Sequence, residues 1–444
     1  MADFFKFFLL TFLVFSFNQT IVESEELSSV LKDAYEYFPD VEKSNTDLKN
    51  ARKDLDFSKR DFLPSIDLSA SQGRQISKSN PDTSKYNDTN LNPASIDIDL
   101  TQPLGYTKVL NFKQSKNKLK IAEFQTQSTV QNVLFRASKA YYTVLKDYFL
   151  LDVSKKNEQN LIKKLEATEK RFEFKDVTKT DVFQAKARLA EATAKRIESE
   201  NNLDISISDF ETVVGRKPDI NWFKSEDVTV TESNPKDWSK FGEIPRIPES
   251  LNESINTGFE QNPDYNQLKL QLENSRLDIS KSNLSFAPEF SITGSLGKSL
   301  DSSRTIERKD TYSVTAEVTV PLFNKGHNFI NLEKSKNTAI STLKSMESKK
   351  LDLKFQIQSA WKKIESTQSS IKSLEMSVDS NEVAVEGVTK EAGVGTRTTL
   401  NILDAEKELT QSESNLVNAQ YQLIISSFEL LKLCGLLNFN YLNF

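Results

Sequence analysis

Four short stretches of the chain alternate between apolar and polar residues, and the apolar residues always fall on even-numbered positions. In the first half of the chain the apolar residues are Ile66, Leu68 and Ala70, followed by Ile96, Ile98 and Leu100. In the second half they are Phe290, Ile292 and Leu296, followed by Tyr312, Val314, Ala316, Val318 and Val320. Alternation over about ten residues is typical of a tilted strand that crosses a membrane. We therefore expect two strand pairs, one within residues 62–105 and one within residues 286–323.

The polar faces of these expected strands carry isolated acids with no basic residue between them. The four acids are Asp67, Asp97, Asp99 and Glu317. A water-filled lumen accommodates such charges, so we expect these side chains to line the lumen of a barrel. Four strands are too few to enclose a lumen, since even small barrels need about eight, and several chains would therefore share one barrel. The alternative is a small periplasmic sheet that lies on the helices.

Two polar segments, residues 75–91 and 298–309, separate the strands within each pair. We expect both to be loops, because their length suits the outward-facing side of an outer-membrane barrel. No stretch after Ser24 resembles a membrane-spanning helix, so any insertion into a membrane would have to use the strands.

The long segments that follow the strands are predicted to be helices. Neither Gly nor Pro occurs between Gly105 and Gly215, although these are the residues that most readily interrupt a helix. Apolar residues recur there at alternating steps of three and four, which indicates packed, supercoiled helices. They are Val130, Val133, Leu134, Ala137, Ala140, Tyr141, Val144, Leu145 and Tyr148, then Val182, Ala185, Leu189 and Ala192. Such a narrow apolar seam needs neighbours on two sides, which a plain coiled coil provides as well as a tube does.

The two halves of the chain repeat each other with a nearly constant offset. Near the start the offset is 224, so that Pro39 matches Pro263, and farther on it is 220, so that Gly215 matches Gly435. Each half is therefore expected to contain a helix, a strand pair and two long helices.

This repeat divides the chain into segments. They are a signal peptide at 1–24, a first structural repeat at 25–216, an equatorial connector at 217–250, a second structural repeat at 251–436 and a C-terminal tail at 437–444. The long helical hairpins occupy residues 109–215 and 327–435. The signal peptide is inferred from the apolar run between Phe4 and Phe17, which is shorter than the ~20 residues of a membrane-spanning helix. Cleavage after Asn18 or after Ser24 fits equally, and a retained anchor is the alternative.

Composition narrows the classes of function. The 444 residues carry a formal net charge of -5, which argues against nucleic acid, because binding to phosphates requires clustered Lys and Arg. Cys434 is the only cysteine and His327 the only histidine, so neither an internal disulfide nor a Cys/His metal cluster can form. No nucleophile with a base and an orienting partner can be nominated, so we expect no catalysis, no cofactor and no metal.

The ends of the two hairpins resemble the helix tips of the TolC family of outer-membrane efflux and secretion ducts. In the second half the run from Val394 to Ala405, VGTRTTLNILDA, is similar to the family's tip motif. In the first half the match is Arg171 and Phe172, followed by the run from Thr180 to Ala185. With the duplicated plan, the resemblance covers essentially the whole mature chain.

The resemblance implies a mainly α fold with a β-barrel portion. Three copies would each contribute four membrane strands to one barrel in the outer membrane, and their helical hairpins would form an α-barrel across the periplasm. Cargo would pass passively through this gated tube, which a periplasmic adaptor protein connects to an inner-membrane pump. The implied site residues are Thr180, Asp181 and Arg397 at the gate, Asn401 and Asp404 at the entrance constriction, and Phe174, Lys175, Asp176, Val394, Gly395 and Thr396 at the adaptor-contact tips.

Three residues depart from the family's pattern. Lys175 and Asp176 replace a small and apolar pair, Ala392 stands where the family often has a tyrosine, and Asn401 replaces one of two acids, leaving Asp404 alone to form a ring. The alternative function is a structural or adaptor-type periplasmic coiled-coil protein that bridges membranes. An adaptor would need one hairpin and a separate β domain, whereas this sequence has two copies of a strand pair with a hairpin.

Overall fold

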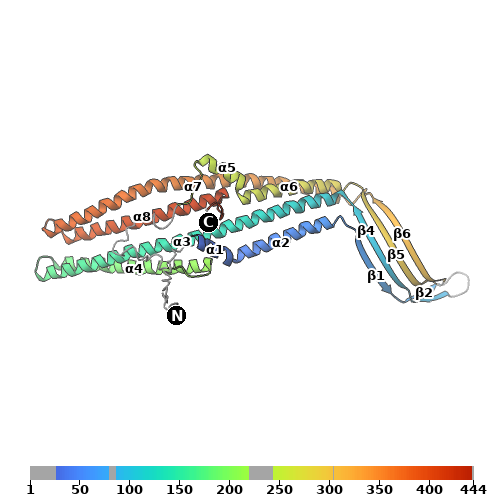
Figure 1. The fold of residues 1–444 in the computed structure, drawn as a ribbon, viewed down its shortest axis with the longest axis horizontal. Coiled ribbons are helices and arrows are strands. Elements are labelled where there is room, and N and C mark those ends of the chain that lie inside the picture. The colour runs from blue at the N-terminus through green and yellow to red at the C-terminus, as the bar shows by residue number, and fades with distance from the viewer. Residues whose placement is uncertain (1–26, 80–86, 220–243, 304, 443–444) are drawn as a thin grey trace, which may run out of the picture. The chain divides into compact units, whose positions relative to one another are not determined.

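The computed structural model describes residues 27–79, 87–219, 244–303 and 305–442 (Figure 1). The expected signal peptide and most of the expected connector lie outside the described residues. The elements of the first half are α1 (Leu27–Tyr37), α2 (Pro39–Arg60), β1 (Ser65–Gln72), β2 (Gln75–Ser79), β3 (Asn87–Leu91), β4 (Ala94–Leu104), α3 (Tyr106–Glu173) and α4 (Lys179–Val214). Those of the second half are α5 (Leu251–Gln261), α6 (Pro263–Leu284), β5 (Glu289–Ser303), β6 (Ile306–Thr319), α7 (His327–Gly393) and α8 (Thr399–Cys434).

The internal duplication is visible in the bounds of the helices. An offset of 224 carries α1 and α2 onto α5 and α6, and an offset of 220 carries α4 onto α8. The expectation of a single helix at the start of each half is wrong, because α2 and α6 begin at Pro39 and Pro263. Proline has no N–H with which to continue a preceding helix, and it holds the residue before it in an extended conformation. Phe38 and Asn262 both adopt that conformation, with ψ of 119°.

The long helices confirm the predicted hairpins. Helices α3 and α7 have 68 and 67 residues, and α4 and α8 have 36 each. Most of the predicted seam of α3 is buried: Val133, Leu134, Ala137, Ala140, Tyr141, Val144 and Leu145 are each at most 4% exposed. Val130 and Tyr148, at the two ends of the seam, are partly buried. None of the helices in the described part of the chain combines the length and the apolar character that a membrane-spanning helix needs.

The four predicted strands form one antiparallel sheet in the order β1-β4-β5-β6, and β2 pairs with β3 in a separate hairpin. The register places Leu68 opposite Ile98, Ile98 opposite Leu296, and Leu296 opposite Tyr312. The even-numbered apolar residues therefore share one face of the sheet, as their alternation predicts.

The two polar segments within the strand pairs are not simple loops, which corrects that expectation. Strands β2 and β3 occupy the two ends of residues 75–91, and within 298–309 β5 runs on to Ser303 while β6 begins at Ile306. Strand ladders are held by backbone hydrogen bonds, which polar residues form as well as apolar ones. Apolar alternation marks only the part of a strand that has an apolar face. It therefore underestimates the length of a strand that continues into polar residues.

The chain packs as two compact units, and each combines parts of both repeats. The first, which we call the tip unit, contains the described residues up to 34 together with 137–219 and 374–418. It includes the turns between α3 and α4 and between α7 and α8. The second, the sheet unit, contains residues 35–136, 244–373 and 419–442. The repeats in the sequence are therefore not the compact units of the structure.

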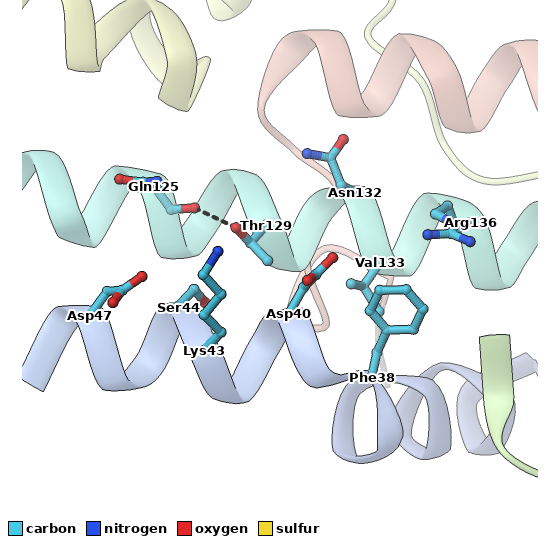
Figure 2. A pocket seen from close by; sticks show the side chains of 10 residues that line it. All are labelled: Phe38, Asp40, Lys43, Ser44, Asp47, Gln125, Thr129, Asn132, Val133 and Arg136. Carbon is cyan, nitrogen blue, oxygen red and sulfur yellow. Dashed lines mark hydrogen bonds between the residues drawn. The ribbon is translucent and has the colours of Figure 1, made fainter. Parts of the chain in front are cut away.

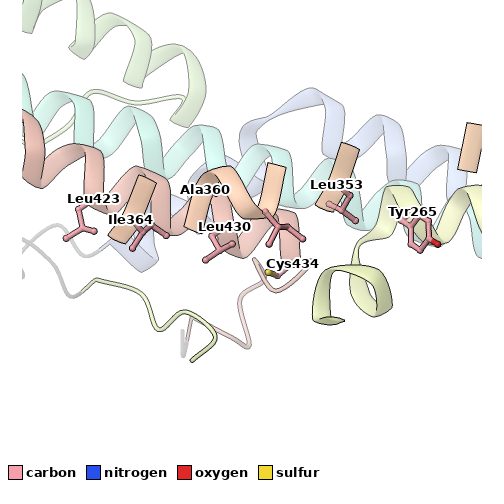
Figure 3. Close-up of a cluster of buried hydrophobic side chains, with 8 residues drawn as sticks. Tyr265, Leu353, Ala360, Ile364, Leu423, Leu430 and Cys434 are labelled. Atoms are coloured by element: carbon pink, nitrogen blue, oxygen red, sulfur yellow. The ribbon is translucent and has the colours of Figure 1, made fainter. Parts of the chain in front are cut away.

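A buried apolar cluster of the sheet unit lies where α6, α7 and the end of α8 meet (Figure 3). Its members are Tyr265, Leu353, Ile357, Ala360, Ile364, Leu423, Leu430 and Cys434. The Cys434 thiol donates a hydrogen bond to the Ser254 carbonyl at 3.4 Å, and burial raises the pKa of the thiol to about 12. This cysteine is therefore a packing residue and a poor nucleophile.

The sheet unit also contains a pocket of about 310 Å³ between α2 and α3 (Figure 2). Its lining consists of Phe38, Asp40, Lys43, Ser44, Asp47, Gln125, Thr129, Asn132, Val133 and Arg136. The lining carries two acids and two bases, and the Arg136 guanidinium lies 4.9 Å from the centroid of the Phe38 ring. Because the charges of the lining balance, the pocket prefers neither an anion nor a cation. We therefore assign no binding site to it.

Candidate functional site

The two hairpin tips share one backbone design. At each tip, a residue in the left-handed conformation ends the first helix, and the next amide bonds to the carbonyl five residues back, at 2.9 Å from Asp176 and 3.0 Å from Thr396. This is the Schellman arrangement. Gly395 adopts the left-handed conformation (φ 82°) without steric cost, whereas Lys175 adopts it (φ 61°) against the preference of a side-chain-bearing residue.

The predicted adaptor-contact residues are exposed at both tips. They are Phe174, Lys175, Asp176, Val394, Gly395 and Thr396. Phe174 and Val394, which the repeat places at equivalent positions, are 83% and 78% exposed. Asp176 accepts a hydrogen bond of 2.7 Å from Arg171. Contact with an adaptor stays a prediction for these residues.

Asp181 caps the start of α4. Its Oδ2 accepts hydrogen bonds from the N–H and the hydroxyl of Thr178, both at 2.7 Å, and Thr178 Oγ1 accepts the Asp181 N–H at 3.3 Å. This capping box satisfies amide groups at the helix start and places a negative charge at the positive end of the helix dipole. Thr180, in the same turn, is exposed.

Asn401 holds the equivalent position at the start of α8. Its Oδ1 accepts hydrogen bonds from the N–H and the hydroxyl of Thr398, at 3.1 and 2.8 Å. The second repeat therefore keeps the side-chain cap and loses its charge. Just before this cap, Arg397 Nε donates to Glu391 at 2.9 Å.

Two of the three predicted gate residues, Asp181 and Arg397, are not paired with each other among the described residues of one chain. Each has a local partner instead, Thr178 for Asp181 and Glu391 for Arg397. A gate contact between copies of the chain would use the second carboxylate oxygen of Asp181 and the terminal guanidinium nitrogens of Arg397. The gate stays a prediction.

Asp404, predicted at the entrance constriction, is paired with α4. Its Oδ1 accepts a hydrogen bond of 2.9 Å from Arg188, which also donates to Glu191 at 3.2 Å. The Asp404 side chain is 53% exposed, so the pair faces solvent. Sequence reasoning missed Arg188, because nothing in the spacing of charges singles it out. The two partners lie 216 residues apart and meet only because α8 packs against α4.

Glu406, also missed, is buried where α8 contacts α3. Its Oε1 lies 3.7 Å from Lys164 Nζ, and no described group donates a hydrogen bond to its Oε2. Burial raises the pKa of the Glu406 carboxyl, and the positive charge of Lys164 opposes this shift. An apolar cluster lies beside the Lys164–Glu406 and Arg188–Asp404 pairs. Its members are Leu161, Ala185, Ala192 and Leu403.

Three of the four predicted lumen acids lie together on the polar face of the sheet. Asp67 on β1 is directly opposite Asp99 on β4, and Asp97 lies two residues along β4. Serine hydroxyls donate hydrogen bonds to Asp97 and to Asp99. Glu317 lies apart on β6. In the described structure none of the four forms an ion pair, and no grouping of His, Cys, Asp and Glu suits a metal ion.

The duplicated hairpins, the sheet and the tip motifs match one known family. The family model described as "Outer membrane efflux protein" matches residues 30–216 and 255–436. The chain belongs to this family. The match spans most of both structural repeats, and it confirms the resemblance that the tip motifs indicate.

Individual family members are similar to the chain over most of their length. The outer membrane efflux protein BepC of Brucella suis biovar 1 is 23% identical over 424 residues, covering 93% of this chain and 86% of BepC. The outer membrane protein TolC of Escherichia coli is 22% identical over 434 residues, covering 94% of this chain and 84% of TolC. The Campylobacter jejuni CmeC outer membrane channel matches with a TM-score of 0.78 at 16% identity, covering 93% of this chain and 86% of CmeC. At that identity the likeness to CmeC shows the fold.

As an outer membrane efflux protein, the chain is an outer-membrane channel with a helical periplasmic portion. The predicted function and location are thereby confirmed, in preference to a coiled-coil adaptor. The family consists of channels and not of enzymes.

Proposed function

We propose that three copies of the chain close into one duct for efflux or secretion, through which cargo passes without any bond being made or broken. The open sheet carries this proposal, because β1 and β6 are edge strands of the four-stranded sheet. Lipid cannot satisfy the unpaired backbone groups of an edge strand, so a membrane sheet needs a neighbour on each side. Trimers are typical of the outer membrane efflux family.

In this assembly the polar face of the sheet lines the lumen and the even-numbered apolar face meets lipid. Apolar side chains on that face are largely exposed in the single chain, among them Leu68 at 70% and Val314 at 83%. Their contact with hydrocarbon removes apolar surface from water. Asp67, Asp97 and Asp99 then face the aqueous lumen, with Glu317 nearer the helical end.

The tip unit forms the periplasmic entrance in this proposal. Thr180, Asp181 and Arg397 hold neighbouring copies together at the closed gate, and Asn401 and Asp404 surround the constriction. The exposed tips, residues 174–176 and 394–396, contact a periplasmic adaptor protein that connects the duct to an inner-membrane pump. The exposure of Phe174 and Val394 supports that contact.

Disulfide cross-linking between the edge strands of neighbouring copies tests the trimer. Cys434 is buried, so cysteines introduced on the exposed sheet are the accessible thiols. We combine Ser69→Cys on β1 with Thr311→Cys, Ser313→Cys or Thr315→Cys on β6 in turn, because the register between copies decides which pair lies opposed.

One of these pairs is expected to give a covalent ladder that ends at the trimer. Within one chain, β4 and β5 separate β1 from β6 by about 14 Å, which is beyond the reach of a disulfide. Ser69→Cys alone is the control and reports random collisions as dimers only. A ladder that extends past the trimer, or no cross-link with any pair, would contradict the closed ring.

A further inference from the structure

Three charged side chains interrupt the apolar face of the β5–β6 hairpin close to where β5 ends and β6 begins, and the apolar Leu300 and Ile306 lie beyond them. Even-numbered residues are apolar on β5 up to Leu296 and on β6 from Tyr312 onward. At the next even-numbered positions they change to Lys298, Arg308 and Asp310. The side chains of all three are exposed. A face that is otherwise suited to lipid therefore carries a charged cluster near one end.

The register brings these three residues together. Asp310 lies directly opposite Lys298, and Arg308 lies opposite Leu300, one row farther along the hairpin. This end of the hairpin is the one remote from α6 and α7, which adjoin the other ends of β5 and β6. Because the helical portion is periplasmic, the charged end points toward the outer leaflet.

The length of the apolar run places Lys298 near a membrane boundary. From Phe290 to Lys298 the strand advances about 26 Å at ~3.3 Å per residue, or about 20 Å of depth at a tilt of ~40°. The apolar band of outer-membrane barrels is about 25 Å tall. Tyr312 lies one row inside the charged cluster, at the depth where aromatic residues line the interface.

The cluster keeps an excess of positive charge. Arg308 donates through Nη2 and Nε to the Asp310 carboxylate at 2.8 and 3.2 Å. Lys298 forms no ion pair with any residue that the structure describes. The cluster thus contains two bases and one acid. The Arg308 guanidinium also has N–H donors that do not bond to Asp310.

We propose that Lys298 and Arg308 bind the phosphate headgroup of a lipid in the outer leaflet. The inference rests on the proposed function, which turns the even-numbered face toward lipid. Ammonium and guanidinium groups form charge-assisted hydrogen bonds with phosphate, and their long stems let the charges reach the headgroup depth. Diagonal neighbours across a strand pair lie about 7–8 Å apart, so one phosphate can bridge both side chains. A headgroup with phosphomonoesters, such as that of lipid A, fits best.

Lipid titration of the purified full chain in detergent tests this site. The readouts are the temperature at which the oligomer dissociates and the lipid copies retained in native mass spectrometry. Lipid A is expected to raise that temperature by several degrees for the wild type, because a ligand of the folded assembly stabilises it. The Lys298→Gln/Arg308→Gln variant should lose most of the shift and of the retained lipid. Asp310→Asn should retain lipid A at lower concentrations, because it removes the competing acid.

Lys309→Gln is the matched control, since Lys309 is exposed on the polar face of the same strand. It should respond to lipid A as the wild type does. An equal loss in this control, or a full response in the double variant, would overturn the proposal. An equal rise in the dissociation temperature with phosphatidylcholine would also overturn the proposal, because it would assign the effect to the apolar face. An equal rise with inorganic phosphate would overturn it as well, because it would identify a site for a free anion.

Conductance of the same preparations in planar bilayers separates this inference from the proposed function. Channels that form in the wild type and in the double variant, with equal responses to lipid A, would contradict the lipid site alone. A wild-type chain that neither assembles nor conducts would contradict the duct and, with it, this inference.

Discussion

Acids at the helix tips and acids on the sheet differ in their partners. At the tips, Asp181 is held by a helix cap and Asp404 by an ion pair with Arg188. On the sheet, Asp67 and Asp99 lie opposite each other with no base beside them in the described structure. Like charges directly opposed in a strand pair destabilise it, so this arrangement costs stability that a function of their electric field would offset.

The place of an acid in a duct therefore does not by itself determine whether its charge is available. A solvated ion pair contributes little to the electrostatic potential beyond its immediate neighbourhood. A lumen lined by side chains of one charge sign instead concentrates counter-ions along a narrow passage. We therefore expect the sheet to set ion preference and the tips to set closure.

Neutralising the sheet acids should have the largest effect. Reversal potentials under a salt gradient should show a cation-preferring wild type. The Asp67→Asn/Asp97→Asn/Asp99→Asn variant should lose about five-fold in the permeability ratio of cation to anion. Glu317→Gln removes an isolated acid and should change the ratio less. Anion preference in the wild type, or an unchanged ratio in the triple variant, would contradict the assignment of this face to the lumen.

Adding an acid at the tips should have the next largest effect. Asn401→Asp doubles the acids at the constriction and should lower the blocking concentration of a trivalent cation by about three- to ten-fold. Its fold should be unchanged, because Asp181 forms the same cap in the first repeat. Thermal unfolding provides that control. If block is unaltered, Asn401 does not lie at the constriction.

Releasing Asp404 from its partner should act in the same direction, more weakly. Arg188→Gln removes the neighbouring positive charge and should lower the blocking concentration about two- to three-fold, within the range of a solvated ion pair. Glu191→Gln, which removes only the second partner of Arg188, is the matched control. A similar decrease in that control would attribute the effect to the lost Arg188–Glu191 contact, because removing an acid shifts the net charge in the opposite direction.

The buried acid should produce a small, pH-dependent effect on stability. Burial raises the pKa of Glu406, so its contribution to stability is fully present below its ordinary value of 4.5 and is lost as pH rises through the higher folded value. Glu406→Gln should therefore raise the free energy of unfolding at pH 7 by roughly 1 kcal/mol and flatten its dependence on pH above 4.5. Lys164→Gln should act oppositely, since it leaves the carboxylate buried without a base. A parallel pH profile in Glu406→Gln would contradict this role.

The two caps should give the smallest difference. Thr178→Ala and Thr398→Ala should each lower stability by about 1 kcal/mol or less. The loss should be larger at Thr178, because its partner is a carboxylate and charge-assisted hydrogen bonds are stronger. Calorimetry on both variants makes the comparison. Equal losses would mean that the charge of Asp181 adds nothing to its cap.

Sequence alone predicted the periodic parts of the molecule. The three-and-four spacing of α3 marks the residues that are buried, and the even-numbered alternation marks one face of the sheet. Both succeed because a regular backbone converts spacing directly into orientation. The hairpin of β2 and β3 was missed because its residues are mostly polar and show no alternation of apolar and polar positions.

The partners of the tip acids were less accessible to sequence reasoning. The Thr178-x-x-Asp181 spacing is a capping signal and could have shown that Asp181 is engaged in its own helix. Arg188 has no such signal, because its contact with Asp404 depends on the packing of two helices from different repeats. Contacts within one helix turn can therefore be predicted from the sequence, whereas contacts between residues far apart in the chain require the structure.

Closure at the tips should raise a barrier that single-channel conductance reports. Three symmetric contacts between Asp181 and Arg397, at about 0–1 kcal/mol each, would favour the closed tube by at most roughly 3 kcal/mol. Asp181→Asn is the sharpest variant, because the cap at Asn401 shows that an amide can replace the carboxylate there. Glu391→Gln breaks only the local pair of Arg397 and is the control.

Conductance of the purified wild type, Asp181→Asn, Arg397→Gln and the double variant in planar bilayers tests the gated duct most directly. Each single variant should conduct more than the wild type, and the double variant should add little, because residues that share one interaction are coupled. Glu391→Gln should conduct as the wild type does. Unchanged conductance in both single variants, or additive increases in the double variant, would contradict a gate formed by Asp181 and Arg397.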